Sequence, residues 1–205
     1  AKKQAQKKDP ETQKLIYGTS CGTFIDRCGP DKSFKTLKEF GFGAIDYGIG
    51  NYWWPDWDIE GIFFEDDDVF FGKMDEVGNA AAKYGIKIHQ MHATFGDVAP
   101  KPSENKPYMH VLKRTFEAAK LLECPYVIVH PVYYHYPDDV PLDEEWEMNR
   151  KFFTALIPWL QENDVICCLE NMFTWDENTT YASCCANPLE AVQYLERLND
   201  IAGEK

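Results

Sequence analysis

The 205-residue chain lacks the features that mark several large protein classes. No apolar run approaches the roughly 20 residues that a membrane-spanning helix needs, so we expect no membrane partner. Lys and Arg number 21 against 34 Asp and Glu, which gives a net charge of −13. Nucleic-acid phosphates attract basic surfaces, so this charge argues against a nucleic-acid partner. No Cys-x-x-Cys pair occurs, which disfavours a structural zinc site.

The seven cysteines are an odd number, and several lie in or beside apolar runs, where a free thiol behaves as a small hydrophobe. We therefore expect a reducing, cytoplasmic location. Cys184 and Cys185 form an exception, because they lie in a polar loop where thiols are open to oxidation, and we assign them no role. Residues 1–14 are polar and lysine-rich, without the apolar segment of a signal peptide, and are expected to form a loose tail. The folded domain is expected over residues 15–205.

Short apolar runs alternate with longer helix-like stretches along that domain. The runs are rich in β-branched and aromatic residues, as buried parallel strands are. They fall at 15–20, 44–49, 86–92, 126–130 and 165–170. The helix-like stretches fall at 33–42, 73–85, 107–123, 142–163 and 187–202. The last has a clear start and stop, with Asn187 as N-cap, Pro188 at the first helical position and Gly203 after the end.

The alternation predicts βα units and hence a parallel sheet, either doubly wound or closed as a (β/α) barrel. No Gly-x-Gly-x-x-Gly follows the first strand, which weakens the dinucleotide-binding version of the first alternative. The third, fourth and fifth runs end in His92, His130 and Glu170. In a barrel such tips converge on one face, where active sites form. The sequence therefore favours an α/β fold of the TIM-barrel type, with these three side chains in its site.

Four segments carry a resemblance to a known family: LKEFGFGAIDYG, AAKYGIKIHQMHATFG, AAKLLECPYVIVHP and WLQENDVICCLENM. The chain resembles the sugar phosphate isomerase/epimerase superfamily, the xylose isomerase-like TIM barrels that include endonuclease IV. The family's active-site His of strand three, His-Pro of strand four and Glu-Asn of strand five match His92, His130 with Pro131, and Glu170 with Asn171.

The resemblance implies that Glu170 is a ligand of a divalent metal ion and acts in proton transfer, with His92 and His130 beside it in catalysis. Mn, Mg, Co and Zn all accept such ligands, so the metal is left open. The implied reaction is isomerisation or epimerisation of a keto sugar or sugar phosphate through an enediolate. In it the metal polarises the carbonyl while a carboxylate removes the adjacent carbon-bound proton.

The family barrel continues for three more strands, which carry an Asp, a His and a second Glu of the metal site. The present sequence ends after about five βα units, so a barrel truncated there is expected. Such a sheet exposes the edges of its first and last strands, which invite association. We expect either a homo-oligomer or a missing C-terminal segment to cover these edges.

Several further residues are candidates for contacting a sugar substrate. Trp53 and Trp54, after the second strand, and Trp175, after the fifth, offer aromatic faces that stack on sugars or pack on the barrel rim. His135 lies in a loop on the same face, and Asn171 follows Glu170. Two other histidines are expected to be structural. His89 should face the helices, because strand side chains alternate and His92 shares its face with Ile86, Ile88 and Gln90; His110 should lie on the surface of a helix. The acidic run EDDD at 65–68 is expected at a solvated helix start.

Three functions remain open from the sequence. The first is the metal-dependent sugar isomerase or epimerase. The second is an endonuclease IV-like phosphodiesterase, against which the net charge speaks. The third is a non-catalytic or degenerate barrel that binds carbohydrate, which the shortness of the chain favours.

Overall fold

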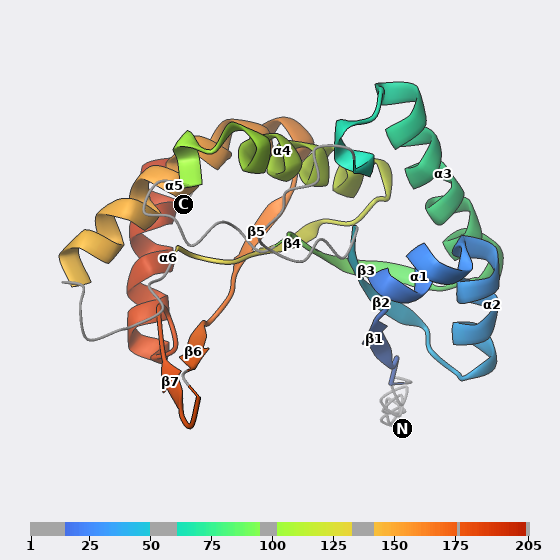
Figure 1. The fold of residues 1–205 in the computed structure, drawn as a ribbon, viewed down its shortest axis with the longest axis horizontal. Helices are drawn as coiled ribbons and strands as arrows, with labels where there is room; N and C mark the ends of the chain where they lie inside the picture. The colour runs from blue at the N-terminus through green and yellow to red at the C-terminus, as the bar shows by residue number, and fades with distance from the viewer. Residues whose placement is uncertain (1–14, 50–60, 95–101, 133–141, 176, 204–205) are drawn as a thin grey trace, which may run out of the picture.

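The computed structural model describes residues 15–49, 61–94, 102–132, 142–175 and 177–203. Its centre is a parallel sheet whose five strands pair in their order along the chain (Figure 1). The strands are β1 (Gly18–Ser20), β2 (Ala44–Gly48), β3 (Lys87–His92), β4 (Tyr126–Val129) and β5 (Ile166–Leu169). Sequential parallel pairing is the arrangement of a (β/α) barrel, whereas a doubly wound sheet changes direction within its strand order. The expected barrel-type fold is confirmed.

Helices connect the strands, and α2 to α5 form an arc around one side of the sheet (Figure 1). The α-helices are α1 (Gly22–Cys28), α2 (Pro30–Glu39), α3 (Asp67–Tyr84), α4 (Lys106–Leu121), α5 (Leu142–Asn163) and α6 (Pro188–Ala202). Two 3₁₀ turns, η1 (Ile62–Phe64) and η2 (Pro102–Glu104), precede α3 and α4. The predicted ends of α6 are confirmed: the Asn187 side chain accepts a hydrogen bond from the Leu189 amide at 2.9 Å, and Gly203 is left-handed at φ 74°.

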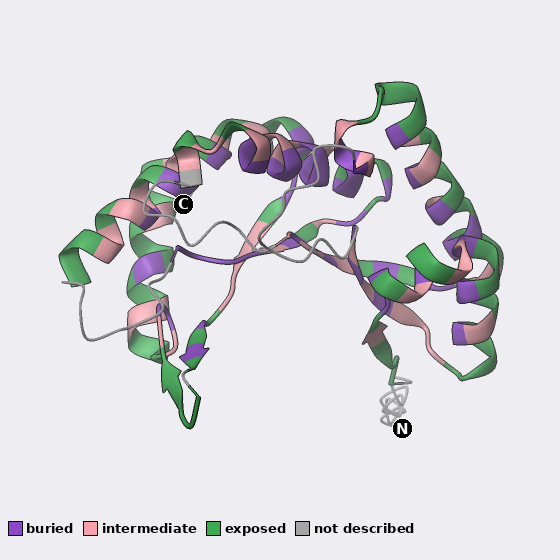
Figure 2. Cartoon of the chain, viewed as in Figure 1, coloured by how far each residue is buried: buried purple, intermediate pink, exposed green. Residues whose placement is uncertain are grey.

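The main hydrophobic core lies between the sheet and this arc of helices. In Figure 2 the buried residues of α3 and α4 lie mainly on the sides of these helices that face the sheet. Truncating one such buried phenylalanine to alanine costs about 3–5 kcal/mol, so this layer fixes the positions of the strands. The largest fully buried side chains are Ile25, Phe34, Ile45, Tyr47, Phe63, Phe70, Met74, Met91, Tyr108, Leu112, Phe116 and Phe152.

The structure adds two elements that the sequence pattern did not predict. Helix α1 occupies the segment between β1 and α2, directly after a strand that is only three residues long. After β5 the chain forms an antiparallel hairpin of β6 (Phe173–Trp175) and β7 (Thr180–Ala182). Both are short, and short elements carry too few periodic positions to be recognised.

The sheet remains open within the described part of the chain. There β1 pairs only with β2, and β5 pairs only with β4, so each has one free edge. No helix among the described residues is long and apolar enough to cross a membrane. All seven cysteines are described and none forms a disulfide; the reducing, cytoplasmic location stays a prediction.

Candidate functional site

Three polar side chains meet at the carboxyl ends of β3, β4 and β5. His92 is the last residue of β3, and His130 and Glu170 directly follow β4 and β5. The Oε2 atom of Glu170 lies 2.7 Å from Nε2 of His130 and 3.1 Å from Nε2 of His92. The two Nε2 atoms are 3.2 Å apart. The fold thus brings together the three side chains that the strand-end pattern singled out.

The three side chains differ in their access to solvent. His130 is only 4% exposed and is the most buried residue of the cluster. The side chains of His92 and Glu170 are 30% and 33% exposed. A molecule approaching the open side of the cluster therefore meets His92 and Glu170 before it meets His130.

Asp46 of β2 is a fourth member of this group, and the sequence analysis missed it. Its Oδ2 lies 3.2 Å from Nδ1 of His92, so the ring can donate this N–H to the carboxylate while Nε2 faces His130 and Glu170. The other oxygen, Oδ1, is buried and has no hydrogen-bond partner among the described residues. A signal was present in the sequence: an acid stands within the apolar run AIDYG, just as Glu170 ends the run of β5.

A bulge in β3 gives His92 its orientation. Ile45 of β2 pairs with Ile88, but the next residue, Asp46, pairs with Gln90, so one residue of β3 is left over. The predicted faces of this strand are therefore wrong in part. Ile88 is buried with the core and does not share a face with His92, and His89 is exposed beside the ring of Tyr126 instead of packing on the helices. Bulges next to active sites commonly redirect a side chain in this way.

The hydrogen bonds of the cluster shift two pKa values in opposite directions. The pKa of His92 is raised to about 9, chiefly by the hydrogen bond to Asp46 and then by the one to Glu170, against the opposing effect of burial. Burial by itself would raise the pKa of Glu170, but the hydrogen bonds from His130 and His92 outweigh it and lower the pKa to about 2. Without a metal, Glu170 is therefore an anion that is hydrogen-bonded to both imidazoles.

The donor geometry fits a divalent metal ion. Ligand atoms about 2.1 Å from a metal and at right angles to each other lie about 3.0 Å apart. The three edges of the donor triangle measure 2.7, 3.1 and 3.2 Å. Asp46 supplies the carboxylate that commonly holds the second nitrogen of a metal-binding histidine. One divalent cation can thus replace the protons on the Nε2 atoms of His92 and His130.

The predicted substrate-binding residues are only partly placed. Trp53, Trp54 and His135 lie outside the described residues. Asn171 is exposed next to Glu170. Trp175 lies in the β6–β7 hairpin, 61% exposed, with its ring 5.8 Å from that of Phe173. Among the described residues, no hydrogen bond, ion pair or ring contact joins Asn171 or Trp175 to the cluster, so their roles in binding stay predictions.

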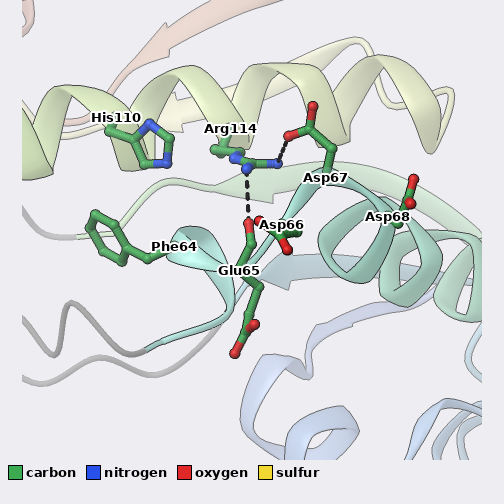
Figure 3. Close-up of a pocket in the computed structure, with 7 residues that line it drawn as sticks. All are labelled: Phe64, Glu65, Asp66, Asp67, Asp68, His110 and Arg114. Atoms are coloured by element: carbon green, nitrogen blue, oxygen red, sulfur yellow. Dashed lines mark hydrogen bonds and ion pairs between the residues drawn. The ribbon is translucent and has the colours of Figure 1, made fainter.

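A second polar hollow lies where α4 meets the start of α3, and it is structural (Figure 3). The Arg114 guanidinium donates to the Glu65 carbonyl at 3.0 Å and pairs with the Asp67 carboxylate at 2.9 Å.

The predicted acidic helix start is confirmed at α3. His110 is not a free surface residue as predicted: it is half-buried, its ring stacks on Phe64, and its Nε2 lies 2.8 Å from the Phe63 carbonyl oxygen.

Solved structures with the same fold share little sequence with this chain. A 3-keto-D-glucoside 4-epimerase from E. coli matches 91% of the chain with a TM-score of 0.63 and 14% identity. An AP endonuclease of family 2 from Brucella melitensis matches 90% with a TM-score of 0.61 and 13% identity. A xylose isomerase-like TIM barrel protein from Mycobacterium smegmatis, solved in complex with magnesium, matches 90% with a TM-score of 0.60 and 14% identity.

The chain is shorter than these three proteins, of which it covers 65%, 64% and 61%. No curated protein matches it in sequence. The family model of the xylose isomerase-like TIM barrels matches residues 34–201, a range that contains Asp46, His92, His130 and Glu170. This match extends over most of the chain and agrees with the sequential parallel sheet and its strand-end cluster. The chain belongs to the xylose isomerase-like TIM barrel family.

Proposed function

We propose that this chain carries the metal-binding part of the active site of a sugar isomerase or epimerase. The observation that supports the proposal most is the convergence of His92, His130 and Glu170 at three neighbouring strand ends. The solved structures that match the fold include a 3-keto-D-glucoside 4-epimerase and a D-tagatose 3-epimerase-like protein. The substrate class proposed is a keto sugar or its phosphate.

In this proposal His92, His130 and Glu170 hold one divalent cation. Such a cation polarises a carbonyl oxygen and lowers the barrier for removing a proton from the adjacent carbon. His130 contacts the cation from the buried side of the cluster, while His92 and Glu170 border the exposed side that a substrate would approach. Asp46 keeps the proton of His92 on Nδ1, which leaves the lone pair of Nε2 for the cation.

Glu170 suits cation binding better than proton transfer at neutral pH. A general base works best when its pKa is near the operating pH, whereas the pKa of Glu170 is lowered to about 2. We therefore assign Glu170 to the cation and expect a second group to carry the proton. This assignment keeps the predicted metal role of Glu170 and gives less weight to its predicted role as the base.

Two other functions remain as alternatives. The donor set of two imidazoles and one carboxylate also suits zinc, and an AP endonuclease of family 2 shares the fold, so a phosphodiesterase is the second candidate. The net charge of −13 opposes it, because a DNA substrate needs a basic surface. The third is a barrel that binds carbohydrate without converting it.

The first test combines metal binding with proton exchange. The metal-free chain is titrated with Mn²⁺, Mg²⁺, Co²⁺ and Zn²⁺ by calorimetry. Each loaded form is then incubated with ketoses in D₂O, and deuterium entering the carbon next to the carbonyl is followed by NMR. We expect Glu170→Gln to weaken metal binding at least about tenfold and to reduce exchange about 10²-fold or more.

Glu177→Gln is the matched control, because Glu177 is an exposed glutamate in the turn between β6 and β7. It should leave both readouts unchanged. Exchange that survives Glu170→Gln at wild-type rate would remove Glu170 from the site. A chain that binds metal and sugar but exchanges no deuterium would instead support the non-catalytic alternative.

A further inference from the structure

A second cluster of ligand-type side chains lies outside the strand-end site. One oxygen of Glu145, one oxygen of Glu190 and Sγ of Cys184 all lie within 4.8 Å of one another. Glu145 is in the first turn of α5, Glu190 in the first turn of α6, and Cys184 follows β7. Three separate segments therefore converge here, so the fold creates a proximity that sequence spacing does not show.

The cluster is enclosed on its apolar side. Cys184 and Cys185 are 2% and 1% exposed and pack with Met172 and Tyr194 in a small core of their own. The sequence analysis expected these two cysteines in a polar, oxidisable stretch, and that expectation is wrong about their surroundings. The buried position shields the two thiols from solvent oxidants and places them where a ligand sphere could form.

The two carboxylates need a positive partner. Within the described residues, neither carboxylate forms an ion pair with Lys or Arg. A cation bound between the two carboxylates would supply the missing positive charge.

The sulfur geometry is compatible with a tetrahedral cation. Zinc binds thiolate sulfur at about 2.3 Å, so two sulfurs on one tetrahedral zinc lie about 3.7 Å apart. Sγ of Cys185 lies 3.7 Å from Sγ of Cys184. Cys185 is not grouped with the two carboxylates, so the site has three protein ligands and leaves the fourth position to solvent.

Neighbouring side chains hold the cluster in place from outside. Asn149, fully buried in α5, donates from Nδ2 to Sγ of Cys184 at 3.6 Å. The same amide group accepts from the Val132 N–H at 2.7 Å and donates to the Val132 carbonyl at 2.9 Å. Tyr194 donates its hydroxyl to Oε1 of Glu145 at 3.4 Å. Outer partners of this kind orient the ligands of metal sites.

We propose that Glu145, Cys184 and Glu190 form a structural zinc site. A thiolate among carboxylates selects zinc over magnesium or calcium, because the two hard cations prefer oxygen ligands alone. On binding, the Cys184 thiol releases its proton to solvent and its sulfur forms the new bond to zinc. The absence of Cys-x-x-Cys excludes a zinc finger, but it does not exclude a site whose ligands come from three elements.

The zinc site would restrain the two segments that follow β4 and β5, next to the strand-end cluster. Asn149 connects Cys184 to Val132, two residues after His130. The Met172 amide, two residues after Glu170, donates to the Cys184 carbonyl at 2.9 Å. A zinc ion here would therefore hold the segments after β4 and β5 against α5 and α6.

Cobalt titration tests the site on the full chain. The protein is freed of metal with EDTA, reduced with a phosphine and titrated with Co²⁺, and the near-ultraviolet thiolate-to-cobalt charge-transfer band is recorded. The strand-end site has no sulfur donor, so this band does not arise there, and the Cys184→Ser variant assigns it among the seven free cysteines. Because the strand-end cluster also takes up Co²⁺, we expect the band to saturate by two equivalents, to vanish on addition of Zn²⁺, and to be absent in Cys184→Ser.

Two further variants complete the test. Cys28→Ser removes a half-buried cysteine of α1 outside the cluster and should keep the band. Glu190→Gln leaves the buried thiols intact, and we expect it to weaken Zn²⁺ binding at this site at least about tenfold. The proposal is overturned if the wild type shows no band or if Cys184→Ser keeps it. Should Cys184→Ser not fold, wild-type affinity in Glu190→Gln overturns the three-ligand site.

Discussion

Asp46 shows how a single residue can define the chemistry of its neighbours. Its carboxylate lies against Nδ1 of His92, so the Nε2 atom of that ring is directed to His130 and Glu170. The three strand-end residues could be predicted from the sequence, because each follows an apolar run. Asp46 lies inside its run, and only the pairing of β2 with β3 shows which side chain it meets.

The first prediction concerns the pKa of His92 in the metal-free chain. Asp46→Asn replaces the carboxylate whose hydrogen bond contributes most to raising this pKa, so the value should fall from about 9 by on the order of one unit. Glu170 should keep it above the ordinary value of about 6.5. Histidine NMR titration in EDTA measures the change. Asp200→Asn, at an exposed position of α6, should leave the titration unchanged.

This shift also implies a pH dependence of stability. The folded-state pKa of His92 lies above its unfolded value, so its contribution is fully present below about pH 6.5 and is lost as pH rises through about 9. The metal-free wild type should therefore exceed Asp46→Asn in unfolding free energy by on the order of 1 kcal/mol near pH 6, after allowance for partial solvent exposure. The difference should shrink at alkaline pH. An equal difference at both pH values, measured by urea unfolding, would contradict the assignment.

Among the elements, β3 and the β6–β7 hairpin mark the limit of prediction from sequence. The alternating pattern located β3, but a period of two cannot show the extra residue that separates Ile88 from the face of His92. The hairpin strands have three residues each, too few for a recognisable period. The long helices α3, α4 and α5 were predicted because they offer several turns of apolar spacing.

Helix α1 and β2 meet so closely that one position between them should accept only glycine. A Cβ on Gly22 would lie 2.2 Å from the carbonyl oxygen of Gly48. In the sheet, Gly48 is the residue of β2 that pairs in register with His92 of β3. Gly22→Ala should therefore separate α1 from the end of β2 and lower the unfolding free energy by roughly 1–3 kcal/mol, although alanine favours helices. Weaker metal binding at the strand ends should accompany this loss.

Gly18→Ala is the matched control for this change. Its Cβ would lie 3.5 Å from the nearest atom, the Ala44 carbonyl oxygen, which is an ordinary contact. Chemical denaturation of both variants provides the comparison. Equal stability of Gly22→Ala and Gly18→Ala would show that α1 can move away from β2 without cost.

At the scale of the whole molecule, the order of the strands was predictable and their closure was not. Regular βα repetition favours neighbouring parallel strands, and the structure has them in sequence order. Whether the barrel closes depends on which segment or partner pairs with the free edges of β1 and β5. The local sequence pattern of these strands does not show that partner. The solved relatives are longer than this chain, so in them additional chain is available for this purpose.

The surface around the β5 edge predicts self-association of the isolated chain. Ile166 is 56% exposed on β5, Leu195 is 40% exposed on α6, and both line an apolar groove between β5, α5 and α6. Covering such a surface gains about 25 cal/mol for each Å² of apolar area, and an open strand edge adds unpaired backbone groups. We expect sedimentation velocity to show a species larger than 23.7 kDa that grows with concentration. Ile166→Lys should shift it towards monomer, whereas Val69→Lys, at an exposed position of α3, should not. A chain that stays monomeric at every concentration would show that this edge is protected without a second copy.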